Sequence, residues 1–159
     1  MSNIKTELVS WSPTFSVGIK LIDDQHKELL DLVNDMFNHV IGDDAAERVY
    51  FQKIIQKAVH YIRVHFTTEE KLMISTNFPG YAEHKKAHDF FVLTVLDIVR
   101  KFETEDKYSL SIFTKFLKEW VLTHIAIMDK LYFTYFKNIA SRKANGTLGT
   151  NHLDAAAAR

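Results

Sequence analysis

The stretch that decides the fold reads His65-Phe-Thr-Thr-Glu69 before a Pro79-Gly80 break and His84-Lys-Lys-Ala-His88 after it. Within each pair, the two side chains that can bind a metal are four residues apart. A step of four residues rotates an α-helix by only about 40°, so each pair lies on one face of its helix. The break lets the two helices fold back on each other, because the residue before proline avoids the helical region. We therefore expect both pairs to face one interior space as ligands of a metal site.

Apolar residues that recur at three- and four-residue steps predict four helices, at about 22–40, 45–75, 82–102 and 108–139. No strand pattern competes with them. Short connections between long amphipathic helices make neighbours antiparallel, so the predicted fold is all-α, an up-down-up-down four-helix bundle. On the fourth helix we expect Ile127, Met128 and Leu131 on the inward face.

The two ends of the chain lack this helical period. Residues 1–20 alternate large apolar with polar or small residues, which predicts an extended leader that covers one end of the bundle. Residues 141–159 contain glycines, asparagines and a run of four alanines. We expect a bundle domain over residues 1–140 and a mobile tail over 141–159.

Composition excludes several classes of function. The 159 residues include 20 basic and 20 acidic side chains, so no electrostatic case exists for a nucleic acid or an anionic membrane surface as partner. No apolar run approaches the roughly 18 residues of a membrane span, and no apolar signal core occurs near the N-terminus, so a cytoplasmic protein is expected. The chain has no cysteine, which excludes disulfides and thiolate metal sites and leaves histidine and carboxylate as the strong metal ligands.

Seven ionisable residues fall on the predicted inward faces of the four helices. They are His26, His65, Glu69, His84, His88, His124 and Asp129. An apolar interior tolerates such groups only if they are paired or bound to metal. Imidazoles with carboxylates suit iron, manganese, zinc and copper alike, so ligand type does not choose the metal.

The number of ligands fits two metals with one vacancy. If two octahedral ions are present, about twelve positions must be filled. Five imidazoles, two bridging carboxylates and a bridging oxide or hydroxide fill about eleven of them. About one position would remain for a small molecule.

At these residues the chain resembles the single-domain bacterial hemerythrins, over about residues 11–138. The motifs that carry the resemblance are Trp11, Ser16-Val17-Gly18-Ile19, Asp23-Asp24-Gln25-His26, His65-Phe66-Thr67-Thr68-Glu69-Glu70 with Met73, Pro79-Gly80-Tyr81-Ala82-Glu83-His84, His88, Trp120, His124-Ile125 and Asp129. Each short piece is a weak signal, but together and in this order they are specific.

The resemblance implies a pair of non-haem iron ions, bridged by oxide or hydroxide, with dioxygen as ligand. His84, His88 and His124 would hold one iron, and His26 and His65 would hold the other, which has the vacancy. Glu69 and Asp129 would bridge the two ions. The implied function is reversible O2 carriage, storage or delivery to an unidentified O2-consuming recipient, without catalysis. Alternatives are O2 or redox sensing, reduction of peroxide or nitric oxide, and iron storage.

Some finer expectations concern residues near these ligands. Trp120 and Val121 lie one turn before His124, so we expect them to line the O2 pocket. His124 and Asp129 are five residues apart, about 140° around an ideal helix. We expect them to straddle the inward ridge of a regular helix, although a π-bulge would also bring them together.

The remaining polar residues near the site have structural interpretations. A single histidine on an apolar face is more often structural than a ligand, and we apply this to His39, His60 and His152. Glu70 is about 100° from Glu69 around the helix, which predicts a solvated or supporting group.

Overall fold

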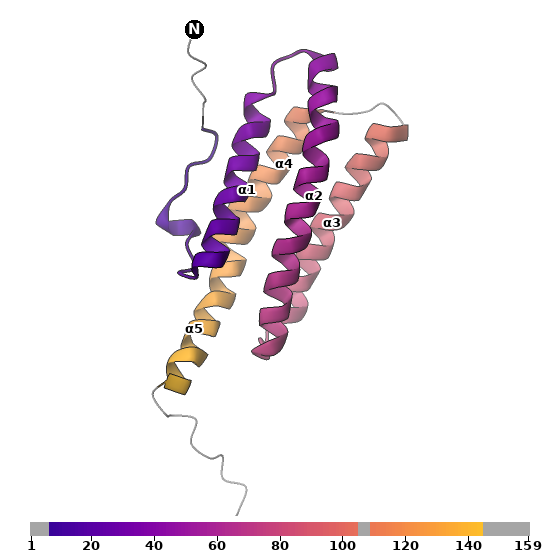
Figure 1. The fold of residues 1–159 in the computed structure, drawn as a ribbon. Helices are drawn as coiled ribbons and strands as arrows, with labels where there is room; N and C mark the ends of the chain where they lie inside the picture. The colour runs from indigo at the N-terminus through magenta and orange to yellow at the C-terminus, as the bar shows by residue number, and fades with distance from the viewer. Residues whose placement is uncertain (1–6, 105–108, 145–159) are drawn as a thin grey trace, which may run out of the picture.

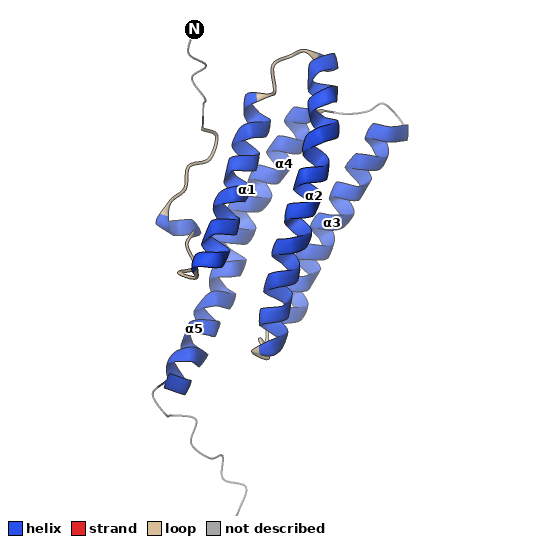
Figure 2. Cartoon of the chain, viewed as in Figure 1, coloured by secondary structure: helices blue, strands red, loops and turns tan. Residues whose placement is uncertain are grey.

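In the computed structural model, which describes residues 7–104 and 109–144, four helical rods form an antiparallel bundle (Figure 1). The first three rods are α1 (Lys20–Asn38), α2 (Asp44–Ser75) and α3 (Tyr81–Thr104). The fourth rod is α4 (Leu110–Thr123), a π-helical segment η2 (His124–Asp129) and α5 (Lys130–Ala144). No strand occurs in these ranges (Figure 2). The predicted all-α four-helix bundle is confirmed.

Local hydrogen bonds explain where α1 and α2 begin. Asp43 caps α2, since its side chain accepts a hydrogen bond from the backbone N–H of Ala46 at 3.0 Å. The residue before α1 provides no such cap. Instead, Asp23 in the first turn accepts hydrogen bonds from the Val17 backbone N–H and the Ser16 hydroxyl, both at 2.7 Å. These hydrogen bonds attach the leader to the first turn of α1.

The turn between α2 and α3 lies at the predicted break. Asn77 adopts a left-handed φ of 51°, a conformation that asparagine tolerates better than most residues. The backbone N–H of Phe78 donates back to the Met73 carbonyl at 3.0 Å. α2 and α3 consequently run antiparallel, and the two residue pairs that flank the break face each other.

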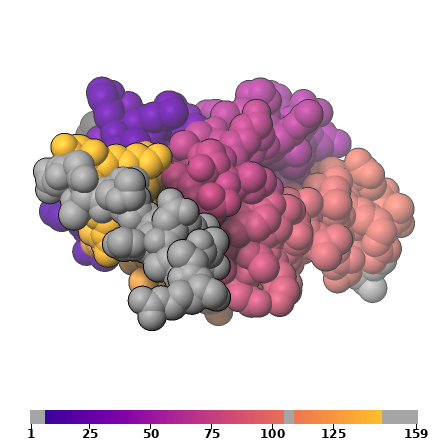
Figure 3. Space-filling view, turned by 90° about the horizontal axis from the view of Figure 1, so that it is seen from below, coloured from indigo at the N-terminus to yellow at the C-terminus, as the bar shows by residue number. Residues whose placement is uncertain are grey.

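We expected the leader to cover one end of the bundle, and this was wrong: from a short 3-10 turn, η1 (Pro13–Phe15), its described part runs back along α1, where the Leu8 and Val9 backbone N–H groups donate to Asn34 Oδ1 at 2.8 and 3.0 Å (Figure 1). Only the last residues of the leader lie at the end where α1 begins. Val17 is buried in a cluster with Tyr132 and Phe133 of α5. The Lys130 ammonium donates to the Thr14 carbonyl at 3.2 Å. Figure 3 views the bundle from this end, where leader and α5 lie side by side.

The last helix departs from the prediction in phase and length. Ile127 and Leu131, which we expected to face inward, are 57% and 65% exposed. A π-helical turn forms i→i+5 hydrogen bonds, so it shifts the phase of the residues within and after it. α5 continues to Ala144, past the predicted end at 139. The rest of the predicted tail, 145–159, lies outside the described residues.

Apolar clusters flank a polar layer inside the bundle. On α1, His26 lies between Ile22 of the smaller cluster and Leu29 of the larger. On α2, Glu69 lies between Phe66 of the larger cluster and Met73 of the smaller. The polar layer is therefore closed off by apolar packing on both sides. Among the helices within the described ranges, none has the length and apolar character of a membrane span.

Candidate metal centre

All seven predicted ligands lie in this one buried layer. Each is at most 2% exposed: His26 0%, His65 1%, Glu69 0%, His84 2%, His88 1%, His124 2% and Asp129 0%. The bundle brings together residues that are as far apart in sequence as His26 and Asp129. Burial of so many ionisable groups is unfavourable unless something pairs with them.

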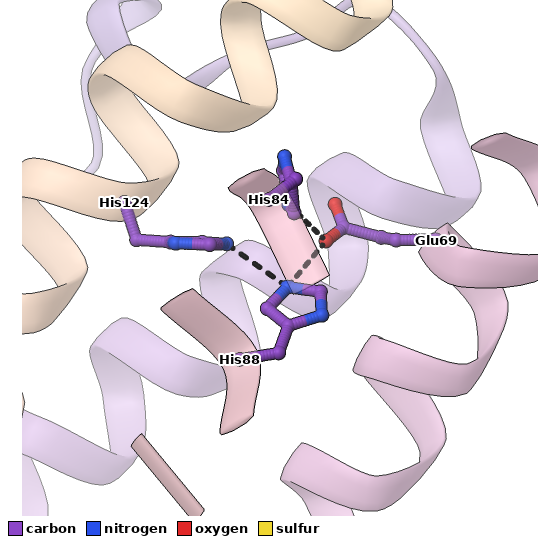
Figure 4. A group of neighbouring side chains, drawn as sticks. All are labelled: Glu69, His84, His88 and His124. Carbon is purple, nitrogen blue, oxygen red and sulfur yellow. Dashed lines mark hydrogen bonds and ion pairs between the residues drawn. The ribbon is translucent and has the colours of Figure 1, made fainter. Parts of the chain in front are cut away.

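The ligand atoms fall into two groups that could each hold a metal ion. One group is Glu69, His84, His88 and His124, and the other is His26, His65, Glu69 and Asp129. Within each group, one atom from every residue lies within 4.8 Å of the others. Figure 4 shows the first group, with the Glu69 carboxylate and the His84, His88 and His124 rings converging from three helical rods.

Glu69 contacts imidazoles of both groups. Its Oε1 atom is 3.7 Å from Nε2 of His65. Its Oε2 atom is 3.5 Å from Nε2 of His84 and 3.4 Å from Nε2 of His88 (Figure 4). The two oxygens of one carboxylate therefore face the two imidazole sets separately.

Asp129 is placed in the same way. Its Oδ1 atom is 3.0 Å from Nε2 of His124 and 3.2 Å from Nε2 of His84. Its Oδ2 atom is 3.2 Å from Nε2 of His26 and 4.0 Å from Nε2 of His65. Both carboxylates thus lie between a set of three imidazoles and a set of two.

The position of Asp129 depends on the π-helical segment. We expected His124 and Asp129 to straddle the ridge of a regular helix, and this prediction was wrong. The segment His124–Asp129 is π-helical, and its i→i+5 repeat brings residues five apart to the same face. The contact at 3.0 Å between the two side chains is the result.

Hydrogen bonds outside the cluster orient three of the imidazoles. Each ring donates its Nδ1–H to an oxygen: His26 to the Phe15 carbonyl (3.1 Å), His65 to Gln25 Oε1 (2.9 Å) and His88 to Glu70 Oε1 (3.0 Å). Such a bond fixes the tautomer and leaves the Nε2 lone pair for a metal. Glu70 therefore supports a ligand, which was one of the two roles that we predicted for it.

Sequence reasoning missed the other two acceptors. Gln25 is adjacent to His26 in the sequence, but nothing there indicated that it would contact His65. The Phe15 carbonyl is a backbone group of the leader, which no residue pattern identifies. Both contacts depend on how the leader, α1 and α2 pack.

The distance between two imidazole nitrogens also fits a metal. Nε2 of His88 and Nε2 of His124 are 3.0 Å apart. Two ligands at right angles, each about 2.1 Å from one ion, are about 3.0 Å apart. Since His88 donates through Nδ1 to Glu70, its Nε2 carries a lone pair toward His124.

Buried polar atoms without hydrogen-bond partners support the same interpretation. Within the described ranges they include Nε2 of His26, His65 and His84 and all four carboxylate oxygens of Glu69 and Asp129. A buried polar group left unsatisfied costs about 1–3 kcal/mol. Cations bound among these atoms would satisfy them together, so the residues present fit a pair of metal ions.

In the metal-free cluster, the pKa values of the imidazoles shift in both directions. Burial lowers the pKa of His65 to about 3, and burial together with His124 lowers the pKa of His88 to about 2. Burial also acts to lower the pKa of His84, but Asp129 and Glu69 outweigh it and raise that pKa to about 9. Imidazoles that resist protonation are good metal ligands, because metal and proton compete for the same lone pair.

Metal binding is expected to weaken as pH falls, because His84 must lose a proton. A raised pKa means that this proton stabilises the metal-free fold below the ordinary pKa of 6.5, and that the contribution is lost as pH rises through about 9. From this group alone, metal affinity should fall about tenfold per pH unit below 9. Calorimetric titration with Co²⁺ in buffers of different ionisation enthalpy, from pH 7 to 9.5, measures affinity and proton release. An affinity that does not change over this range would contradict the prediction.

Aromatic rings pack against the three-imidazole set. The Trp120 ring stacks on His124 with centroids 4.2 Å apart, and the Phe66 ring stacks on His88 at 3.7 Å. Val121 is fully buried. Phe66 was not singled out from the sequence, yet its ring centroid is also 6.0 Å from that of His65. The role of Trp120 and Val121 in an O2 pocket stays a prediction.

Two of the other histidines lie away from the cluster. His39 donates to the Asp35 carbonyl at 2.7 Å near the end of α1 and stacks on Tyr50. His60 is exposed. His152 lies outside the described residues.

Comparison with known proteins agrees with this site. The family model described as the Hemerythrin HHE cation binding domain matches residues 17–136. A Bacteriohemerythrin of Methylococcus capsulatus is 29% identical over 126 residues, which cover 79% of this chain and 94% of that protein. A Myohemerythrin of Sipunculus nudus is 28% identical over 122 residues, covering 77% of this chain and 88% of the relative.

A solved structure shows the same fold. The crystal structure of wild-type hemerythrin superimposes with a TM-score of 0.70 at 29% identity, covering 80% of this chain and 96% of the solved one. The family model covers far more than half of the sequence and includes all seven residues of the polar layer. The chain belongs to the hemerythrin family.

Proposed function

We propose that this protein binds dioxygen reversibly at a pair of non-haem iron ions bridged by oxide or hydroxide. The observation that carries the proposal is the placement of Glu69 and Asp129, each with one oxygen beside the three-imidazole set and the other beside the two-imidazole set. Two carboxylates in this arrangement can bridge two cations. Family membership supports iron and dioxygen, which the ligand types alone leave open.

The ligand assignment follows from the two groups. His84, His88 and His124 would hold one iron, and His26 and His65 would hold the other. Glu69 and Asp129 would bridge them. The second iron would have one imidazole fewer, so a free coordination position would lie on the side of His26 and His65. When bound, the iron pair supplies the redox-active centre at which O2 binds.

Side chains on the vacant side hold the ligands and exclude water. Gln25 fixes the ring of His65 through Nδ1, and the Tyr61 ring stacks on His65 with centroids 5.9 Å apart. Ile62, three residues before His65 on α2, is buried. Dry packing of this kind would slow the loss of protonated superoxide and so favour reversible binding.

The surroundings favour carriage over reductive turnover. Reduction of peroxide or nitric oxide needs a proton donor beside the vacancy. The Tyr61 hydroxyl is the phenol next to His65, but it already donates to the Gln25 backbone carbonyl, and burial raises its pKa further. We therefore propose a binding protein rather than an enzyme, with delivery to an unidentified O2-consuming recipient. Location in the cytoplasm stays a prediction.

Repeated oxygenation tests the proposal. Protein loaded with ferrous iron under argon is exposed to O2 and then returned to argon, while the visible spectrum is recorded. We expect an absorption band that appears with O2 and disappears without it over several cycles, and no band in zinc-loaded protein. Irreversible bleaching, with consumption of added peroxide or nitric oxide over many turnovers, would contradict carriage.

A further inference from the structure

The outward face of α3 carries large apolar side chains that the fold leaves exposed. Phe90 and Leu93 are 64% and 66% exposed, and Figure 1 places α3 at the edge of the bundle. Neither residue contributes to the metal centre, whose ligands on α3 are His84 and His88. Exposed apolar side chains that form a contiguous patch mark an interaction surface more often than scattered ones do.

These residues belong to a continuous stripe with a charged pair at each end. At steps of three and four residues, the stripe consists of Glu83, Lys86, Phe90, Leu93, Asp97 and Arg100. Within the chain, Lys86 pairs with Glu83 at 2.6 Å and Arg100 pairs with Asp97 at 3.1 Å. Alternating steps of three and four are the spacing by which helices pair along one seam.

We propose that α3 pairs antiparallel with α3 of a second copy of this chain. With the two-fold axis between positions 91 and 92, Phe90 lies opposite Leu93 of the second copy, and Leu93 lies opposite its Phe90. A two-fold interface of this kind uses the same patch on both chains. The proposal concerns oligomeric state and stands apart from the metal centre.

Charge complementarity selects this register. Lys86 lies opposite Asp97 of the second copy, and Glu83 lies opposite Arg100 of the second copy, so all four charges of each stripe meet opposite charges. Parallel pairing in register would place each charge against its like. An antiparallel pair shifted by one heptad would place Phe90 or Leu93 against a charged residue. Of these ways to pair the two stripes, only the proposed register places apolar residues against apolar residues and charges against opposite charges.

The neighbouring positions are compatible with this pairing. Leu96, which is 57% exposed, lies on the same side of the seam as Asp89 of the second copy. Ala87 and Thr94 of the two copies flank the opposite side, so no like charges meet directly at either edge of the seam. A single pair of helices buries less surface than a permanent dimer usually does, so a dissociation constant in the micromolar range is expected.

Sedimentation velocity of the iron-loaded full chain tests the pairing. We expect a dimer that dissociates on dilution, and a Leu93→Glu protein that stays monomeric at all concentrations. Leu131→Glu is the matched control, because Leu131 is 65% exposed on α5 and should leave the dimer unchanged. Helical content and iron content confirm that each variant is folded. A monomeric wild-type chain, or a dimer that survives Leu93→Glu, would overturn the proposal.

Charge reversal tests the register. Lys86→Glu alone and Asp97→Lys alone should each weaken the dimer at least about tenfold, because each places like charges opposite each other. The double variant restores opposite charges and should recover most of the affinity. If Lys86 and Asp97 acted only within their own chain, the double variant would not recover the dimer affinity. Two single variants whose effects simply add in the double variant would overturn the antiparallel register.

Cross-linking provides a second readout, since the natural chain has no cysteine. Lys86→Cys protein mixed with Asp97→Cys protein should form a disulfide-linked dimer on mild oxidation. Each variant alone should cross-link far less, because its cysteine lies opposite a different residue. Equal cross-linking in the single-variant samples and in the mixture would count against the proposed pairing.

Discussion

The Glu69→Ala protein is expected to retain neither iron ion after desalting, because Glu69 belongs to both ligand groups. Its two oxygens face His65 on one side and His84 and His88 on the other, at 3.4–3.7 Å. Removal of the carboxylate takes one ligand from each ion and leaves two cations without a shared negative charge between them. We expect each affinity to fall by more than about 100-fold, which exceeds the usual effect of residues that only support ligands.

Two matched variants define what this result means. His65→Ala removes a ligand from the two-imidazole set alone, so this protein should retain about one iron per chain and lose O2 binding. Glu70→Gln changes the adjacent carboxylate, which accepts a hydrogen bond from His88 but lies outside both ligand groups, and should retain both ions. Iron is measured by atomic emission against protein concentration. Two irons in the Glu69→Ala protein, or two irons with normal O2 binding in the His65→Ala protein, would refute the assigned roles.

Removal of the metal is expected to lower the melting temperature by on the order of 20 °C. A ligand present at 1,000 times its dissociation constant stabilises the folded state by about 4 kcal/mol per site. Two such sites give about 8 kcal/mol, and 1 kcal/mol corresponds to roughly 2–4 °C in a domain of this size. The effect is large because, within the described part of the chain, several carboxylate oxygens and imidazole nitrogens of the polar layer have no hydrogen-bond partner.

Differential scanning calorimetry of the same sample before and after chelation under argon provides the measurement. The Glu69→Ala protein is the control, and its melting temperature should not respond to added ferrous iron. An equal melting temperature with and without iron in the wild-type chain would show that the cluster is stable without cations. That result would contradict the physical basis of the site.

The sequence predicted the parts of the site that depend on regular helix geometry. His65 with Glu69 and His84 with His88 are four residues apart, and this spacing places each pair on one face in any α-helix. The Pro79-Gly80 break then sets the antiparallel direction of α2 and α3. Burial of the five histidines and Glu69 followed from their phase relative to the apolar residues.

The parts that the sequence did not predict depend on irregular backbone or tertiary packing. The π-helical turn brings Asp129 to the face of His124 and turns Ile127 and Leu131 outward. A five-residue spacing is compatible with either arrangement, so only the packed bundle decides between them. The contacts of Phe15 and Gln25 with the ligands are likewise products of how the leader and α1 pack.

Anomalous diffraction at the iron absorption edge, from crystals of the ferrous iron-loaded protein, tests the central claim most directly. We predict two iron peaks per chain inside the bundle, one among His84, His88 and His124 and the other between His26 and His65, with Glu69 and Asp129 between them. A single peak, or iron bound elsewhere with these seven side chains unligated, would contradict the account.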